Sequence, residues 1–240
     1  MKRFLLAALF FAVLLLIWEV LFRAKIWSPV LLPSPRQVAV YLEGAAVDGT
    51  LAKAIIVTMR RLLIGYIIGL LVGLPLGLLT ARWKVLQDTI GTLALGLQTL
   101  PSVCWVPLAL LWFGQTEAAM LFVVVMGTLW SVVIATETGV RNVPPMYTQA
   151  GRNFGLSTRA LIARVIFPAV LPRILVGLRI AFGVAWLVLV AAEMIAVDSG
   201  LGYLIIDARN AGKRYDLVVG GMLLIGVIGL ALDALIVPRS

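Results

Sequence analysis

Apolar stretches long enough to cross a lipid bilayer recur along the chain, and they constrain its fold more than any other feature. Between Leu62 and Ala81, for example, no residue is charged. A helix rises about 1.5 Å per residue, so about 20 apolar residues cover the roughly 30 Å of bilayer hydrocarbon. The pattern predicts an all-α integral membrane protein of about six transmembrane helices. The expected spans are 4–22, 62–81, 89–113, 118–136, 174–197 and 217–237.

The composition also points to lipid as the solvent. Of the 240 residues, 62% are hydrophobic and 13% are charged, whereas a typical soluble domain has about 25% charged residues. The net charge is +9, but the Lys and Arg residues lie between the apolar stretches, where basic residues set membrane topology. We therefore expect one transmembrane domain over 1–240, contact with membrane lipid and no nucleic-acid partner.

The residues that usually carry catalysis are few. The chain has no histidine, which is the commonest general base and metal ligand, and its one cysteine, Cys104, lies in an apolar stretch where a small buried residue is expected. No Gly-rich phosphate loop ends in Lys-Ser or Lys-Thr. We expect no catalytic residue, no metal site and no cofactor bound by this chain, so that it is not an enzyme.

Glycine and proline mark two special segments. Gly65, Gly69, Gly73 and Gly77 are four residues apart, so on a helix they share one face that another helix can approach closely. In the third span, Pro101 and Pro107 interrupt the apolar run. An interrupted helix is tolerated in a membrane where protein or a water-filled cavity satisfies its backbone, so this span either lines a pathway or is a kinked packing helix.

The distribution of charge predicts the orientation. No acidic residue lies between Glu137 and Glu193, whereas six arginines do. Such a basic segment is expected on the cytoplasmic side, and six spans then place both termini there as well.

The segment 137–173 reads as a helical hairpin that projects from the membrane. Pro144 and Pro145 suit a helix start, and 146–154 can be helical. Gly155 allows a left-handed turn, and Ser157 is a candidate N-cap for a second helix that ends near Pro168. A rigid hairpin is suited to docking on another protein, although its arginines would also bind lipid headgroups.

The hairpin sequence resembles the Glu-Ala-Ala loop of bacterial ABC importer permeases. That loop reads Glu-Ala-Ala, three residues, Gly, nine residues, Ile-x-Leu-Pro, and the spacing here is the same. Gln149 replaces the acid and Gly151 the second alanine, while Val165 and Phe167 replace the Ile and the Leu. The matching residues are Gln149-Ala150-Gly151, Gly155 and Val165-Ile166-Phe167-Pro168.

From about Leu32 onward the chain also resembles permeases of the nitrate, sulfonate and taurine class. The motifs that carry this resemblance are Leu100-Pro101, Trp105-Val106-Pro107, Leu111-Trp112-Phe113-Gly114, Gly177-Leu178-Arg179, Ala185-Trp186, Ala192-Glu193-Met194 and Gly200-Leu201-Gly202-Tyr203.

The resemblance implies a type I ABC permease fold and an importer in the bacterial cytoplasmic membrane. Two permease copies, two ATPase subunits that bind ATP and an extracytoplasmic substrate-binding protein would form the complex. Its solute would be small and anionic, such as a sulfonate, taurine or nitrate. The residues that would dock the ATPase through the coupling loop are Gln149, Ala150, Gly151, Phe154, Gly155, Leu156 and Pro168.

Four residues are candidates for the translocation path: Arg60, Pro101, Trp105 and Glu193. Positive charge at Arg60 would attract an anion to the outer mouth, although headgroup anchoring explains Arg60 and Arg61 equally. Glu193 and Arg179 both fall in the fifth span, where an ionisable side chain faces a cavity or a partner. They are about 21 Å apart along one helix, so a salt bridge from each to another span is the alternative to a role in transport.

A secondary transporter driven by an ion gradient is the main alternative function. Such proteins commonly show two related halves and relays of acidic or histidine residues within their spans, and neither pattern is visible here. A membrane enzyme would need a catalytic constellation, and a passive channel subunit would not need a projecting hairpin.

Overall fold

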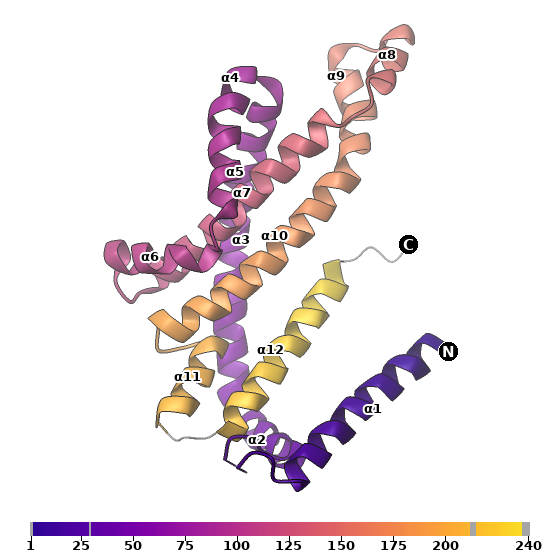
Figure 1. Cartoon of the computed structure of the whole chain (residues 1–240). Coiled ribbons are helices and arrows are strands. Elements are labelled where there is room, and N and C mark those ends of the chain that lie inside the picture. Colours follow the sequence, from indigo (N-terminus) through magenta and orange to yellow (C-terminus); the bar gives the residue numbers. More distant parts are fainter. Residues whose placement is uncertain (1, 29, 212–214, 237–240) are drawn as a thin grey trace. The chain divides into compact units, whose positions relative to one another are not determined.

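The computed structural model describes residues 2–28, 30–211 and 215–236, and these parts contain helices but no strand. Figure 1 shows the elements in chain order. Their bounds are α1 Lys2–Arg23, α2 Pro35–Val47, α3 Thr50–Arg82, α4 Lys84–Leu86, η1 Gln87–Gly91, α5 Thr92–Thr99, η2 Ser102–Cys104, α6 Trp105–Phe113, α7 Glu117–Arg141, α8 Pro145–Asn153, α9 Thr158–Leu161, η3 Ile162–Ile166, α10 Phe167–Ala196, α11 Leu201–Ala211 and α12 Tyr215–Ile236.

The chain divides into two compact units, and three helices contribute to both. The first unit consists of Met1–Thr58 and Glu193–Leu230, and the second of Met59–Ala192 and Ala231–Ser240. Because α3, α10 and α12 run from one unit into the other, neither unit is continuous in sequence.

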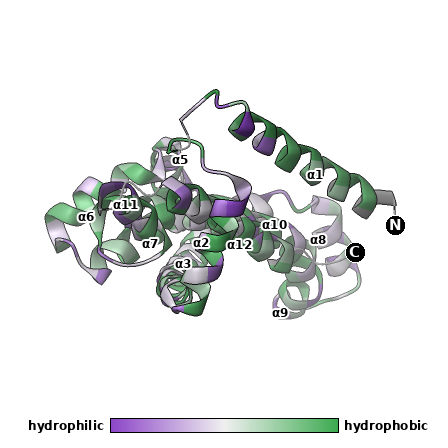
Figure 2. Ribbon diagram, turned by 90° about the horizontal axis from the view of Figure 1, so that it is seen from below, coloured by the Kyte–Doolittle hydropathy of each residue, from purple (hydrophilic) through white to green (hydrophobic). Residues whose placement is uncertain are grey.

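Four helices within the described residues are long and apolar enough to cross a membrane: Thr50–Arg82, Glu117–Arg141, Thr158–Asn210 and Tyr215–Leu235. The bent pair Lys84–Thr99 and Ser102–Phe113 makes a fifth if it counts as one span. The helix α1 is not in this count, although Figure 2 shows it hydrophobic along most of its length and its leucines Leu6, Leu9 and Leu16 are exposed. These apolar outer surfaces confirm an all-helical membrane protein, with four or five counted spans against about six expected.

The bend in the third expected span has a local cause. The two helices on either side of Pro101 meet at 97°. Leu100, which precedes the proline, is extended with ψ of 130°, because a proline ring disfavours the helical conformation of the residue before it. Pro107, also expected to interrupt the run, instead lies in the first turn of α6, where a missing N–H costs no helical hydrogen bond.

The prediction of a glycine packing face is confirmed in the second unit. Gly65, Gly69, Gly73 and Gly77 of α3 face Val124, Thr128, Val132 and Thr136 of α7, and a Cβ on any of these glycines would lie 2.6–2.8 Å from the opposing side chain. Such a distance is too short for two carbon atoms. The glycines therefore allow α3 to lie directly against α7.

One prediction about the hairpin is wrong. The second helix does not end near Pro168, because α9 continues through η3 into α10 without a break. A proline within a helix lacks an N–H and its ring crowds the carbonyl four residues earlier, which here belongs to Arg164. Arg164 lies in the wider π-type turn Ile162–Ile166, which makes room for the ring, since such turns interrupt the regular α-helical ladder.

Further differences concern single segments. α3 begins at Thr50, well before the expected span over 62–81, and α11 was not expected as a helix at all. Cys104, expected to be buried, is exposed.

Candidate functional site

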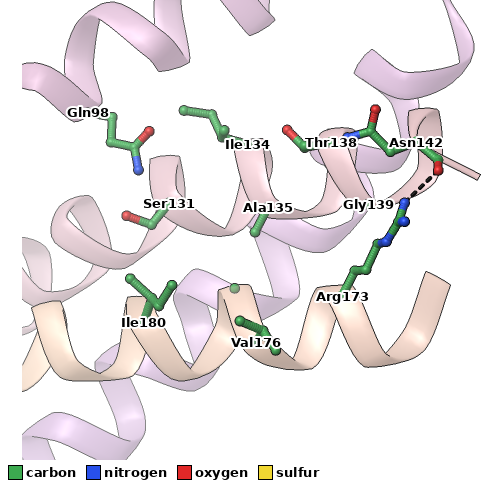
Figure 3. A pocket seen from close by; sticks show the side chains of 11 residues that line it. Gln98, Ser131, Ile134, Ala135, Thr138, Gly139, Asn142, Arg173, Val176 and Ile180 are labelled. Carbon is green, nitrogen blue, oxygen red and sulfur yellow. Dashed lines mark hydrogen bonds between the residues drawn. The ribbon is translucent and has the colours of Figure 1, made fainter.

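A cavity of about 650 Å³ lies between α5, α7 and α10 within the second unit. Figure 3 shows its side chains, which project from the three helices into a common space. Gln98, Ser131 and Ile180 lie at one end, and Thr138, Asn142 and Arg173 at the other. The complete lining is Gln98, Ser131, Ile134, Ala135, Thr138, Gly139, Asn142, Arg173, Val176, Gly177 and Ile180.

The polar members of this lining follow one face of α7. Ser131 and Thr138 of α7 and its C-cap Asn142 are spaced by seven and four residues, which places them on one helical face. Polar side chains that face lipid are costly, so in membrane helices they face protein or a water-filled space. This face of α7 is therefore unsuited to lipid and suited to water, a solute or another protein.

A second, smaller cavity of about 310 Å³ adjoins the first at the bend of the broken helix. Pro101 and Trp105, both candidates for the pathway, lie in its wall together with Ser102 and Trp130. Three residues line both cavities, one from each of the helices α5, α7 and α10: Gln98, Ser131 and Ile180.

The charge of the cavity walls is positive. Arg173 is the one charged side chain among the described residues that line either cavity, and no carboxylate does so. The guanidinium of Arg173 donates a hydrogen bond to the backbone carbonyl of Asn142 (Figure 3). A solute in these cavities thus meets hydrogen-bonding groups and a cation.

The hairpin is a second candidate site, and its turn follows from Gly155. Gly155 has a φ of +71°, which confirms the predicted left-handed turn. Its N–H donates to the carbonyl of Arg152 at 2.9 Å, and the N–H of Leu156 donates to the carbonyl of Gly151 at 3.1 Å. This pair of bonds is the Schellman motif, which satisfies carbonyls at the end of a helix.

The start of the next helix also matches the prediction. The hydroxyl of Ser157 accepts a hydrogen bond from the N–H of Ala160 at 3.4 Å, so Ser157 is the N-cap of α9. Gly151 is buried against the next helix, because a Cβ there would lie 2.4 Å from Cδ1 of Leu161. The alanine expected at this position in the motif would not fit against Leu161 as it lies here.

The outer surface of the hairpin is apolar where a soluble loop would be polar. Phe154 is 85% exposed and Met146 is 66% exposed. Gln149 and Ala150 are exposed on the same helix, and Leu156 is half-buried. Pro168 lies apart from this surface, exposed in the first turn of α10. Exposed apolar side chains gathered on a short helix are typical of a protein-binding surface.

Glu193 is completely buried within the first unit. The hydroxyl oxygen of Thr58 lies 2.9 and 3.0 Å from its two carboxylate oxygens and accepts the N–H of Leu201 at 2.9 Å. The N–H of Gly202 donates to the same carboxylate at 3.1 Å. Glu193 therefore joins α10, α3 and the start of α11, with its carboxyl group at the N-terminal end of that helix.

Two sets of ion pairs lie within the second unit. Arg61, which is 2% exposed, donates to Glu117 at 2.6 and 3.0 Å, and Arg60 lies 3.3 Å from the same carboxylate. Arg179 makes a bidentate ion pair with Asp233 of α12, at 2.5 and 2.7 Å. The interhelical salt bridge considered for Arg179 is confirmed, and Arg60 lines neither of the two cavities.

The candidate pathway residues thus fall in three places: Pro101 and Trp105 together, Arg60 beside Glu117, and Glu193 in a buried cluster. The predicted site residues do not include those that dominate the larger cavity, namely Gln98, Ser131, Thr138, Asn142 and Arg173. A signal was present for three of them. Gln98 is the one amide side chain in the apolar run 89–113, and Ser131 and Thr138 are one helical heptad apart.

Comparison with known proteins gives a consistent assignment. Residues 73–237 match the family of binding-protein-dependent transport system inner membrane components. An ABC transporter permease of Methanocaldococcus jannaschii is 36% identical over 227 residues, which cover 92% of this chain and 84% of that protein. The nitrate import permease NrtB of Synechocystis is 32% identical over 234 residues, 94% and 84% of the two chains. SsuC of Escherichia coli, named as an aliphatic sulfonates transport permease, is 35% identical over 219 residues, 90% and 82%.

Solved structures show the same fold. An amino acid ABC transporter matches with a TM-score of 0.69 and 18% identity, over 81% of this chain and 94% of that one. The MetNI methionine ABC transporter in inward-facing conformations matches with a TM-score of 0.58 and 18% identity, over 75% and 91%.

Proposed function

This chain belongs to the family of binding-protein-dependent transport system inner membrane components, multi-pass permeases of ABC importers, and we propose that it forms half of a pathway for a small anion. The larger cavity carries the proposal. Its wall combines hydrogen-bonding groups with the cation Arg173, and no carboxylate of the described residues contributes to it. An anion in this space meets no fixed negative charge, whereas a cation meets repulsion from Arg173.

The relatives suggest which anion to test. Two of them are named as permeases for nitrate and for aliphatic sulfonates. Both solutes carry one negative charge on a group of three oxygens, which accept hydrogen bonds from amide and hydroxyl donors. We infer that the solute of this chain is of the same chemical class.

The exposed face of the hairpin is the proposed docking site for an ATPase. Phe154 and Met146 present apolar surface that water does not favour, and the Schellman turn at Gly155 fixes the angle between α8 and α9. One hairpin per chain fits two permease copies and two ATPases, with ATP bound by those partners. In this arrangement the hairpin and both termini are cytoplasmic, and the chain lies in the bacterial inner membrane.

Co-purification tests the docking site. The tagged chain is isolated from its native membrane in mild detergent, and the associated ATPase is measured for wild type, Phe154→Ala and Gly155→Arg. We expect both variants to lose the ATPase, because the first removes exposed apolar area and the second opposes the left-handed turn. Phe11→Ala in α1, where Phe11 is 57% exposed, is the matched control and should keep it. Retention of the ATPase by both hairpin variants would contradict this docking site.

Uptake tests the pathway. Arg173→Gln should lower nitrate or sulfonate uptake while ATPase co-purification is unchanged, because a cation that attracts the solute is lost. Arg164→Gln removes an arginine of η3 that lines neither cavity and should leave uptake at the wild-type level. Equal uptake by wild type and Arg173→Gln would mean that the solute does not pass this wall.

A further inference from the structure

We propose that Gln98 and Ser131 form a neck that selects small oxyanions by hydrogen bonds from uncharged donors. This inference rests on the proposed passage of an anion through the cavities of the second unit and assigns the residues that recognise it.

The side chains that define the neck lie where the two cavities meet. Gln98 of α5, Ser131 of α7 and Ile180 of α10 are the three residues that line both cavities. Figure 3 shows them together at one end of the larger cavity. A solute that moves from one cavity to the other would therefore pass beside an amide, a hydroxyl and an aliphatic side chain.

The donors of Gln98 and Ser131 are available to a solute. Within the described part of the chain, neither the amide of Gln98 nor the hydroxyl of Ser131 has a hydrogen-bond partner. Most polar groups in a protein are paired with protein or water, so these two groups can exchange water for a solute. Trp130, which lines the smaller cavity, has a buried indole N–H that is also without a partner among the described residues.

The chemistry of the donors points to an oxyanion. The amide nitrogen of Gln98 carries two donors and the hydroxyl of Ser131 one, and a hydrogen bond to an ionised acceptor is stronger than one to a neutral acceptor. A planar or tetrahedral group of three oxygens can accept from both side chains at once. The third shared residue, Ile180, is apolar and offers the solute no hydrogen-bonding group.

The three residues that define the neck are uncharged, which suits a site that an anion passes through rather than one that binds it tightly. Conduction requires that a solute bind well enough to enter and weakly enough to leave. Arg173 lies at the other end of the larger cavity (Figure 3), so the fixed positive charge attracts the solute without holding it at the neck. An added cation at position 98 would disturb this balance.

Uptake by the complete transporter tests the neck, with nitrate and ethanesulfonate as the two probes. Four substitutions are made: Gln98→Glu, Gln98→Leu, Gln98→Lys and Ser131→Ala. Gln115→Glu is the matched control, because Gln115 is an exposed glutamine that lines neither cavity. Membrane level and ATPase co-purification are measured for every variant, so a folding defect is recognised separately.

The expected results differ between variants. Gln98→Glu should lower uptake at least tenfold by repulsion, and Gln98→Leu and Ser131→Ala should raise KM about tenfold or more, as expected for lost hydrogen bonds to a charged group. Gln98→Lys should lower KM and kcat together, a change that a structural role alone would not produce. Gln115→Glu should match wild type.

One outcome would contradict the proposed neck and another would contradict the proposed anion pathway, and the two can be distinguished. Wild-type KM and kcat in both Gln98→Glu and Gln98→Leu would show that the solute does not contact this residue. If wild type takes up neither probe although an ATPase co-purifies, the anion class itself is wrong.

Discussion

From the sequence alone, Glu193 is compatible with a role in transport or with a structural contact to another helix. A carboxylate in an apolar stretch is compatible with a role in transport, but here Thr58 and the N–H of Gly202 enclose it. Gly200 takes part as well, because its φ is +106° and a Cβ would lie 2.3–2.5 Å from the carboxylate atoms. The Gly200-Leu201-Gly202 motif is therefore explained by the carboxylate that it surrounds.

Gly200→Ala should destabilise the protein by about 1–3 kcal/mol, the usual cost of a strained backbone conformation. The measurement is the melting temperature in detergent. Gly183→Ala in α10 is the control, because a Cβ there meets nothing within 4 Å and alanine favours a helix by about 0.5–1 kcal/mol. Equal melting temperatures for the two variants would show that the carboxylate cluster tolerates displacement.

Gly151→Ala should destabilise the hairpin, because its new Cβ would lie 2.4 Å from Cδ1 of the buried Leu161. Overpacking of this kind costs about 1–3 kcal/mol, against about 1 kcal/mol gained in helix propensity. Adding Leu161→Val should recover stability, since the clashing methyl group is withdrawn. Limited proteolysis measures how fast the hairpin is cleaved in wild type, in Gly151→Ala and in the double variant. If the double variant is cleaved as fast as Gly151→Ala, the proposed contact is wrong.

Asp48 supplies a prediction about pH outside the spans. The N–H of Thr50 donates to its carboxylate at 2.8 Å, and this bond holds the pKa of Asp48 below its ordinary value of 3.8. A carboxyl with a lowered pKa in the folded state stabilises the fold above its unfolded pKa, and the effect disappears as pH falls through the folded pKa. Wild type should therefore melt above Asp48→Ala at pH 7, and the difference should shrink below about pH 4. A difference that is constant across this range would rule out the charge as its source.

At the scale of helices, the glycine face of α3 was predictable and the ends of the helices were not. Four glycines at a spacing of four residues define a face whatever helix lies opposite. By contrast, α3 begins at Thr50, where the N–H of Thr50 donates to Asp48, and hydropathy does not show this polar start. The helix α11 begins beside the buried carboxyl group of Glu193, a contact that hydropathy also does not show.

Gly77→Ala tests the contact between α3 and α7. Its Cβ would lie 2.7 Å from the backbone carbonyl of Val133 and 2.6 Å from Cβ of Thr136, neither of which can rotate away, so the helices must separate. We expect a loss of about 1–3 kcal/mol, seen as a lower melting temperature. Gly96→Ala in α5 meets nothing within 4 Å and should not lower it. If Gly77→Ala and Gly96→Ala have equal melting temperatures, α3 and α7 are not closely packed at Gly77.

At the scale of the whole molecule, the sequence indicated the membrane, the family and the hairpin, but not the pathway. Hydropathy and motif spacing are local properties and can be read along the chain. The larger cavity depends on which faces of α5, α7 and α10 converge, and Gln98 and Ser131 are far apart in sequence. The pathway candidates Pro101 and Trp105 were found because a proline breaks a helix locally, whereas Arg173 looked like one more basic residue of the hairpin segment.

A second permease copy is expected to cover the polar face of α7. Two versions of the chain with different affinity tags, expressed together, should purify with each other from mild detergent, because Ser131 and Thr138 are unfavourable neighbours for lipid. Replacing both with leucine should preserve membrane insertion but abolish uptake. Recovery of each tag alone from wild type would contradict pairing of two copies.

The unbroken path from α9 through η3 into α10 has a mechanical consequence. Thr158 and Ile180 lie on one helical rod, about 33 Å apart at 1.5 Å per residue. A tilt of about 5° at the hairpin end would move the far end by about 3 Å, close to the width of a water molecule. Arg173 and Val176 lie on the same helix, so a force on the hairpin would move the wall of the larger cavity as well. The wide turn at 162–166 and Pro172 are two places where this helix can bend instead of transmitting the force.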